Sequence, residues 1–249
     1  MSKRPTLFLI DGSSYMYRAF FAIPHLSNSS GVPTNAVYGF TTMLHKIIND
    51  YKPDYLALVF DTPAPTFRHE VYQDYKANRP EMPDTLAAQI PYIKAVVKGF
   101  NIALLEKEGF EADDIIGTIA RTEENKGFEI IIASGDKDLL QLVNEHTTVM
   151  DTMKDKRFYA NGVIDHLGVE PRRVTDYLGL VGDSSDNVPG VHGIGKKTAL
   201  KLLEHYESIP DILKHTESMT SKKVKENLIK FADQALLSKQ LVTLDTEVP

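Results

Sequence analysis

Three carboxylates within four residues open one stretch of the chain. Glu111, Asp113 and Asp114 stand at the start of an apolar-periodic segment that predicts a helix. A single acid in a first helical turn usually only caps the helix. Three together repel one another, by up to about 4 kcal/mol per pair at an effective dielectric of 20, so nearby cations would stabilise them.

Three further apolar runs end in aspartate. The runs end at Asp11, Asp61 and Asp136, and another aspartate, Asp138, follows the last. Short runs rich in β-branched residues between helical patterns predict buried strands of a parallel sheet. Any one of these acids taken alone is as easily the cap of the next helix. Because ligands collect beyond the carboxyl ends of parallel strands, the repeated position predicts that the acids meet the Glu111 helix at one edge.

The elements that must position these acids can be read from the same periodicities. Besides those three runs, a strand is predicted at 102–105 and a strand pair within 147–159. Helices are predicted at 15–21, 34–50, 67–79, 84–98 and from 111 onward. From about Gly162 the pattern is helical with short turns, which predicts a domain boundary there.

Aromatic and basic residues are interleaved between 67 and 79. That composition suits stacking on bases and pairing with phosphates. The alternative is an ordinary amphipathic helix whose aromatics face the core, and the acids in the stretch favour it on composition alone. The residues concerned are Phe67, Arg68, His69, Tyr72, Tyr75, Lys76 and Arg79.

Two stretches of the helical part carry chemistry. Asp183 and Asp186 stand three apart, so on a helical turn they would face the same way. Residues 188–199 form a glycine-rich hairpin that opens a basic helix. Backbone amides at a helix N-terminus make an anion site, and the side chains of Lys196, Lys197 and Thr198 add donors. The glycine spacing is not that of a Walker loop.

Composition sets further bounds. The 249 residues contain no cysteine, which excludes disulfides, a thiolate nucleophile and a cysteine zinc site. The first apolar run is too short for a secretory or membrane segment, so we expect a cytoplasmic protein that does not bind membranes. The net charge of −6 argues against a polyanionic partner, but without the nine clustered acids the remainder carries +3.

An all-oxygen cluster selects hard cations, Mg²⁺ or Mn²⁺. Two such ions about 3.5–4 Å apart can activate water and stabilise the attacking and leaving oxygens of a phosphodiester. No serine stands in a recognisable triad setting, and this chemistry needs no protein nucleophile. Arg18, close in sequence to Asp11, could bind a phosphate or pair with a carboxylate, and residue type alone favours neither.

The ordered motifs resemble those of the 5′-nuclease domain of bacterial DNA polymerase I, within the flap endonuclease superfamily, over essentially the full length. In the polymerase, proofreading-like and polymerase domains follow, whereas this sequence stops at Pro249. The motifs are LIDGSS at 9–14, VFD at 59–61, YKANRP at 75–80, EADD at 111–114, SGDKD at 134–138, and GDSSDN at 182–187 continuing through Gly195.

The resemblance implies an α/β domain at 1–161, with a mostly parallel, PIN-like or Rossmann-like sheet flanked by helices and a helical arch near 67–98. It implies a helical DNA-binding domain at 162–249, with a helix-hairpin-helix near 188–203. The implied activity is that of a monomeric, structure-specific 5′ nuclease, both 5′→3′ exonuclease and flap endonuclease. Its substrates would be DNA with 5′ flaps, nicks or 5′ ends, including RNA primers, in replication and repair, with the phosphate left on the 5′ side of the products.

The resemblance also assigns roles to residues. Tyr75, Lys76 and Arg79 would lie on the arch and grip the strand to be cut, with Arg18 assisting at the scissile phosphate. The hairpin residues Gly193, Gly195, Lys196, Lys197 and Thr198 would hold the uncut duplex, with K⁺. Two or more divalent ions would be bound by Asp11, Asp61, Glu111, Asp113, Asp114, Asp136, Asp138, Asp183 and Asp186.

Two alternatives remain. A non-catalytic DNA-structure-binding module would use the hairpin and arch for binding, with structural metal ions. Such a binding module would have little reason to concentrate acids near phosphates, because the negative charges repel. A related metal-dependent ribonuclease of the same sheet type would not need a duplex-holding hairpin.

Overall fold

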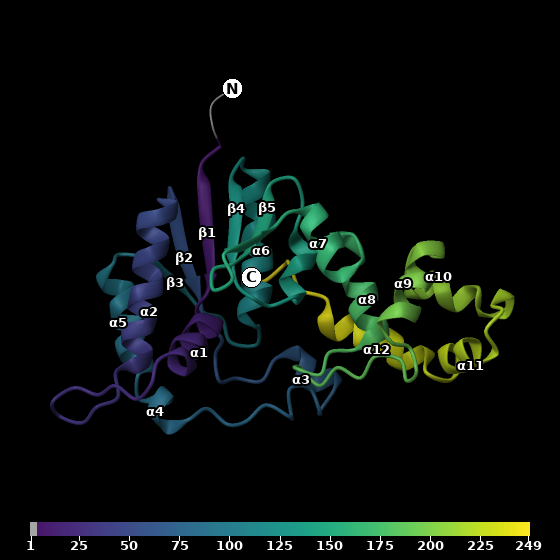
Figure 1. Cartoon of the computed structure of the whole chain (residues 1–249), viewed down its shortest axis with the longest axis horizontal. Helices are drawn as coiled ribbons and strands as arrows, with labels where there is room; N and C mark the ends of the chain where they lie inside the picture. The colour runs from purple at the N-terminus through teal and green to yellow at the C-terminus, as the bar shows by residue number, and fades with distance from the viewer. Residues whose placement is uncertain (1–3) are drawn as a thin grey trace.

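The computed structural model describes residues 4–249, and its centre is one six-stranded sheet (Figure 1). The strand order is β3-β2-β1-β4-β5-β6, and every pairing is parallel except that of β5 with β6. The predicted mostly parallel sheet with a final strand pair at its edge is therefore confirmed. The strands are β1 Thr6–Asp11, β2 Tyr55–Val59, β3 Ala103–Leu105, β4 Glu129–Ala133, β5 Thr147–Asp151 and β6 Lys156–Phe158.

Alternate side chains of the strands point to opposite faces of the sheet and pack into two hydrophobic cores. On β1, Phe8 and Ile10 face the core beneath helices α1, α2 and α5, and Leu7 and Leu9 face the core that contains α6. Burial on both faces explains why these strands are unbroken apolar runs. The flanking helices are α1 Gly12–Ala22, α2 Asn35–Lys46, α5 Ile90–Gly99 and α6 Ala112–Asn125, and a π-helical turn, Ile47–Tyr51, extends α2.

The carboxyl-terminal helices lie beside the sheet (Figure 1). Their core is continuous with the α6 face, since Leu178 and Val242 belong to the same buried cluster as Leu9. The end of the chain returns to α6, where the Val248 amide donates to the Thr118 hydroxyl at 3.1 Å. These helices are α7 Ala160–Leu167, α8 Val174–Val181, α9 Lys196–His205, α10 Ile209–Lys214, α11 Lys222–Lys230 and α12 Ala232–Val242.

The helix predicted across 67–79 is wrong. Helix α3 covers only Phe67–Val71, and α4, Asp84–Ala87, starts after a long irregular segment that runs below α1 in Figure 1. Lys76 has a φ of 57° and its amide donates to the Asp186 carbonyl at 2.9 Å. Tertiary hydrogen bonds to the loop after α8 therefore replace the helical ones, and we call residues 72–83 the arch segment.

The strand order places a topological switch point beside β1, whose neighbours β2 and β4 lead to opposite edges of the sheet. Ligands of open α/β sheets bind beyond the carboxyl ends of the strands at such a point. Within residues 4–249, no helix is long and apolar enough to span a bilayer.

Candidate metal centre

The aspartates at the carboxyl ends of β1 and β2 meet the start of α6. Asp11 caps α1, with its Oδ1 accepting from the Ser14 amide at 2.8 Å. Its Oδ2 accepts from the Ser134 hydroxyl at 2.9 Å. Asp61 Oδ1 accepts from the amide of Ala112, the first residue of α6, at 2.8 Å. The sheet edge and the acidic helix thus come together as predicted.

Burial and mutual repulsion raise the pKa values of acids in this cluster. Burial and the neighbouring Asp61 charge raise the pKa of Asp11 to about 7, against two hydrogen bonds that lower it. Burial raises the pKa of Asp113 well above its usual range, and the charges of Asp136, Asp11 and Asp61 raise it further. We call Asp11, Asp61, Asp113 and Asp136 the first acid group. Their charges destabilise one another when the carboxyls are ionised.

A second acid group joins the two parts of the chain. Asp138 opens a 3₁₀ turn, Asp138–Leu142, after β4, and Asp183 and Asp186 follow α8. One carboxylate oxygen of each lies within 4.8 Å of the others, and all three side chains are buried. The amide of Asp138 donates to Asp136 Oδ1 at 2.9 Å, so the two acid groups adjoin.

The donor set fits hard divalent cations. Among the described residues, Oδ1 of Asp113 and Oδ1 of Asp138 are buried and have no hydrogen-bond partner. A buried carboxylate oxygen without a partner is costly, and a bound cation would satisfy it. One such oxygen lies in each acid group. All of the potential ligands are carboxylates, which is the chemistry that Mg²⁺ and Mn²⁺ prefer.

Cations of the arch segment already lie against the second acid group. Lys76 Nζ lies 2.5 Å from Glu111 Oε1 and 3.6 Å from Asp186 Oδ2, and the Arg79 guanidinium pairs with Asp186. Burial alone would raise the pKa of Asp186, but Lys76 and Arg79 outweigh it and hold that pKa below its usual range. The two basic residues of the arch segment therefore lie beside the carboxylates of Glu111 and Asp186.

Tyr75 does not lie on the surface as expected for a base-stacking residue. Its ring is 4% exposed and belongs to the α6 core. Its hydroxyl donates to Glu111 Oε2 at 3.1 Å and is 3.2 Å from Asp186 Oδ2. Burial and the two carboxylates raise the pKa of Tyr75. The expectation of an exposed side chain is corrected, because the irregular arch segment turns the ring inward.

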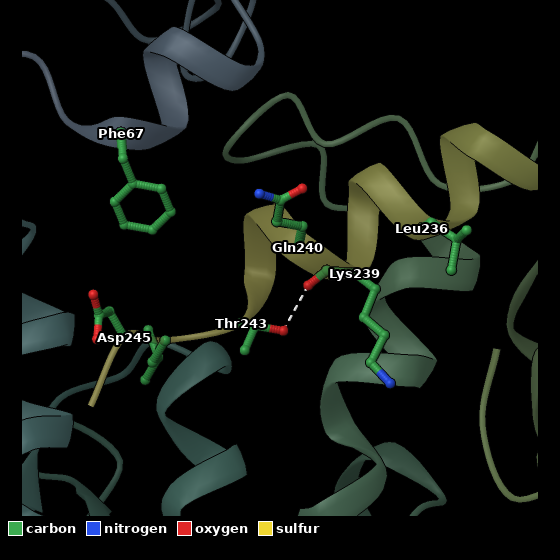
Figure 2. Close-up of a pocket in the computed structure, with 7 residues that line it drawn as sticks. Phe67, Leu236, Lys239, Gln240, Thr243 and Asp245 are labelled. Carbon is green, nitrogen blue, oxygen red and sulfur yellow. Dashed lines mark hydrogen bonds between the residues drawn. The ribbon is translucent and has the colours of Figure 1, made fainter. Parts of the chain in front are cut away.

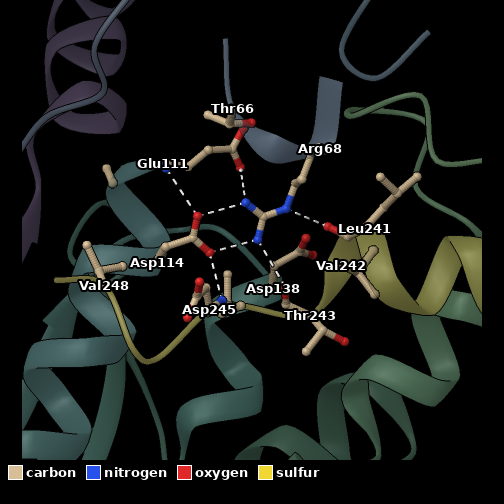
Figure 3. A network of polar contacts seen from close by, with 12 residues as sticks. Thr66, Arg68, Glu111, Asp114, Asp138, Leu241, Val242, Thr243, Asp245 and Val248 are labelled. Atoms are coloured by element: carbon tan, nitrogen blue, oxygen red, sulfur yellow. Dashed lines mark hydrogen bonds and ion pairs between the residues drawn. The ribbon is translucent and has the colours of Figure 1, made fainter. Parts of the chain in front are cut away.

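Glu111 and Asp114 differ in their surroundings, although both open α6 (Figure 3). Glu111 contacts Lys76 and Tyr75 and lies at the metal centre. Asp114 is fully buried, and both its oxygens are bonded to the Arg68 guanidinium at 2.7 Å. Of the nine acids predicted to bind metal, Asp114 is the one that accepts two protein hydrogen bonds on each of its oxygens.

Arg18 lies over the carboxyl end of β4. A Cβ on Gly135 would overlap its guanidinium, so Arg18 lies against Gly135, the residue before Asp136. Its Nη1 lies 3.3 Å from Asp151 Oδ1, and its side chain is 24% exposed. Arg18 pairs with a carboxylate and remains partly open to solvent, so both readings of its sequence position retain support.

The glycine-rich hairpin precedes α9. Gly193 has a φ of 77°, which glycine adopts without strain, and a Cβ there would overlap the Asn227 amide. Gly195 precedes the helix with open space where a Cβ would stand. Lys196 and Lys197 are exposed in the first turn of α9. The hairpin thus presents open space beside Gly195 and exposed cationic side chains, with Thr198 next in the helix.

Two hollows lie near α3 and the arch segment. One, of about 590 Å³, lies beside the arch segment and is lined by Tyr17, Asp61, Lys76, Arg79 and others. The other, of about 460 Å³, lies between Phe67 of α3 and the end of α12 (Figure 2). Only the first reaches the predicted site residues.

The roles of two residues of the site were not predicted. Lys137 Nζ lies 2.7 Å from Asp183 Oδ1, and it could have been suspected from its place between Asp136 and Asp138. Arg68 is only 1% exposed. Nothing in its local sequence distinguishes it from the exposed basic residues of the same stretch.

Known proteins resemble the whole chain. The family described as 5′-3′ exonuclease, N-terminal resolvase-like domain, matches residues 6–168, and the 5′-3′ exonuclease C-terminal SAM fold matches residues 169–249. The chain is 47% identical to DNA polymerase I of Bacillus subtilis over 253 residues, covering 100% of this chain and 29% of that protein. It is 52% identical to a 5′-3′ exonuclease of Aquifex aeolicus over 212 residues, covering 85% of this chain and 73% of that one.

A solved structure shares the fold. The bacteriophage T5 flap endonuclease, crystallised as a pseudo-enzyme-product complex with DNA and metal ions, matches with a TM-score of 0.81 at 20% identity, covering 97% of this chain and 90% of the other. The helical carboxyl-terminal part is therefore of the SAM type, attached to a mostly parallel sheet. The chain spans under a third of the length of the B. subtilis polymerase.

Proposed function

The chain belongs to the 5′-3′ exonuclease family, and on that premise we propose that it is a divalent-metal-dependent 5′→3′ exonuclease and flap endonuclease. It hydrolyses phosphodiesters of DNA with 5′ flaps, nicks or 5′ ends, leaving the phosphate on the 5′ side of the products. It acts as a monomer in primer removal during replication and in repair. The two domains are residues 1–161 and 162–249.

One observation carries the proposal. Asp138 comes from the sheet, and Asp183 and Asp186 come from the loop after α8, yet their oxygens lie within 4.8 Å of one another. A pure binding module has no reason to bury like charges from two parts of the chain beside a nucleic-acid surface, because their repulsion opposes both folding and phosphate binding.

The acid groups are the proposed sites of two or more Mg²⁺ or Mn²⁺ ions. Glu111 and the first acid group hold one side, and the second acid group holds the other. Bound ions would supply activation of water and neutralisation of charge on the phosphodiester. The unpartnered oxygens of Asp113 and Asp138 support this assignment.

Lys76 and Arg79 are proposed to exchange partners when substrate binds. Both now neutralise Glu111 or Asp186. Ions at the acid groups would take over that neutralisation and free the two cations for phosphate oxygens. Arg18 is proposed to contact the same phosphate, since its guanidinium is partly exposed and lies against Gly135.

The hairpin is the proposed clamp on uncut duplex. Its amides at the start of α9 would bind backbone phosphates, with K⁺ bridging and Lys196, Lys197 and Thr198 donating. Gly195 keeps the approach open, since no protein atom lies within 4 Å of the position of a Cβ there, and Gly193 supplies the positive φ of the turn.

The test is a panel of 5′-flap, nicked and single-stranded DNA incubated with Mg²⁺ or EDTA, with the cuts mapped at nucleotide resolution. The proposal expects Mg²⁺-dependent cuts at 5′ ends and at flap junctions, and weaker cutting of single strands. Cutting in EDTA, or tight binding without any cut in Mg²⁺, would contradict it.

A further inference from the structure

Arg68 is buried at the meeting point of three elements (Figure 3). Its Nε donates to the Leu241 carbonyl at 2.8 Å, and its Nη2 donates to the Thr243 carbonyl at 3.0 Å, both at the end of α12. Its two terminal nitrogens also donate to Asp114 on α6, at 2.7 Å each. One guanidinium therefore ties α3, at the start of the arch segment, to α6 and to the carboxyl-terminal helices.

Arg68 also reaches the metal centre. Its Nη1 lies 3.4 Å from Glu111 Oε2, on a carboxylate that Tyr75 and Lys76 contact as well. The rigid fork of a guanidinium can fix two carboxylates at once, which a point charge cannot. The position of Glu111 thus depends on Arg68.

Asp114 has no oxygen left for a metal ion. Its Oδ1 accepts from Arg68 and from the Asp245 amide at 2.9 Å, and its Oδ2 accepts from Arg68 and from the Glu111 amide at 3.1 Å. With no exposed surface, this carboxylate is saturated by four donors. Asp113, its neighbour in sequence, has a buried oxygen with no partner.

We propose that Arg68 and Asp114 are a positioning pair, which holds Glu111, the base of the arch segment and the end of α12 in register, and that Asp114 binds no metal ion. The inference rests on the proposed function only in taking Glu111 and Asp113 as metal-binding residues. The saturated carboxylate carries it, together with a guanidinium that makes four hydrogen bonds and an ion pair to Glu111.

Metal-free melting separates the two aspartates without any assay of activity. In EDTA, Asp114→Asn should lower the melting temperature by at least about 5 °C, because it leaves Arg68 buried without its main counter-charge. Asp113→Asn, the matched control, should leave the melting temperature unchanged or raise it, because it removes a charge repelled by Asp11, Asp61 and Asp136. Equal, small shifts for both variants would overturn the proposal.

Ion counting adds a readout that a merely structural role does not move. At saturating Mn²⁺, Asp114→Asn should bind as many ions as the parent, and Asp113→Asn should bind fewer. Loss of an ion from Asp114→Asn, with its metal-free melting temperature intact, would show that Asp114 is a ligand. Because neither measurement uses DNA, failure here is distinct from failure of the proposed nuclease activity.

Coupling between the two residues provides the last control. If they act as a unit, Arg68→Lys combined with Asp114→Asn should melt within about 2 °C of the less stable single variant. Lysine keeps the charge and the fold is expected to survive, but the fork is lost. Additive shifts would mean that Arg68 and Asp114 act separately, which would overturn the pair.

Discussion

The hydroxyl of Tyr75 lies 3.1 Å from Oε2 of Glu111, with its ring in the core below the metal centre. Tyr75, a residue of the arch segment, thus packs below the carboxylates and contacts two of them, Glu111 and Asp186. Order in the arch segment and order at the metal centre are coupled through this contact, through Lys76 and through Arg68.

Tyr75→Ala should therefore destabilise the fold, by roughly 3–5 kcal/mol, the usual range for emptying a large buried aromatic site. Tyr75→Phe keeps the ring and should melt close to the parent, with weakened metal binding because Glu111 loses a donor. Chemical unfolding measures the first effect, and Mn²⁺ titration measures the second. Tyr38→Ala is the matched control, since Tyr38 is 60% exposed. Parent-like stability of Tyr75→Ala would contradict the burial described here.

Loss of the arch cations should impair cleavage more than folding. Arg79 is 49% exposed along its side chain, so Arg79→Ala should melt near the parent. Lys76→Ala and Arg79→Ala should each cut flap DNA roughly 10- to 100-fold more slowly, with partial recovery at low salt, because a phosphate contact is lost. Rates in a salt series test this, with the exposed Lys98→Ala as control. A parent-like rate at every salt concentration would rule out the phosphate role.

Substitutions at the hairpin should discriminate between substrates. Lys196→Glu with Lys197→Glu, or Gly195→Leu, should weaken binding of duplex-containing DNA far more than of single strands. The lost contacts are to the backbone of the uncut duplex, so the slope of affinity against salt should also decrease. Affinities for both substrates at several salt concentrations give the answer. Lys46→Glu with Lys98→Glu changes the charge equally on the sheet domain, and should affect the two substrates alike. An equal loss on both substrates for the hairpin variants would exclude a duplex clamp.

Stability of the metal-free protein should fall as pH rises. The folded-state pKa of Asp11 is raised to about 7, above its value in the unfolded chain, chiefly by burial. The folded state therefore binds more protons than the unfolded state between those two values, and stability is lost as pH rises through about 7. Melting in EDTA from about pH 5 to about pH 8 tests this. Asp11→Asn should flatten the dependence, and an unchanged slope would contradict the assignment.

Parts of the molecule that follow from local pattern were predictable. The strands β1, β2 and β4, which lead to Asp11, Asp61 and Asp136, are apolar runs, and a run buried on both faces is recognisable without tertiary information. Their parallel pairing then brings the acids to one edge. The predicted meeting of strand ends and acidic helix required nothing else.

Features that depend on distant contacts were not predictable. The segment 72–79 has a helix-like composition, but its backbone bonds to the loop after α8, as when the Lys76 amide donates to the Asp186 carbonyl. The same contacts bury Tyr75, which the family resemblance placed on the arch as a base-stacking residue. Arg68 and Asp114 are adjacent only because α3 and α6 converge, and no periodicity encodes a buried ion pair.

The most direct measurement of the central claim is single-turnover cleavage of a 5′-flap substrate in Mg²⁺ by the parent and by Asp136→Ala, alongside melting of both proteins in EDTA. Asp136 belongs to the first acid group and adjoins the second, so its loss should slow cleavage by at least about 100-fold. Its metal-free melting temperature should be equal to or above that of the parent, because burial and the neighbouring Asp186 and Asp183 charges raise the pKa of this carboxyl. A variant that cuts in Mg²⁺ at the parent's rate would contradict the proposal that the converged acids are the catalytic metal centre.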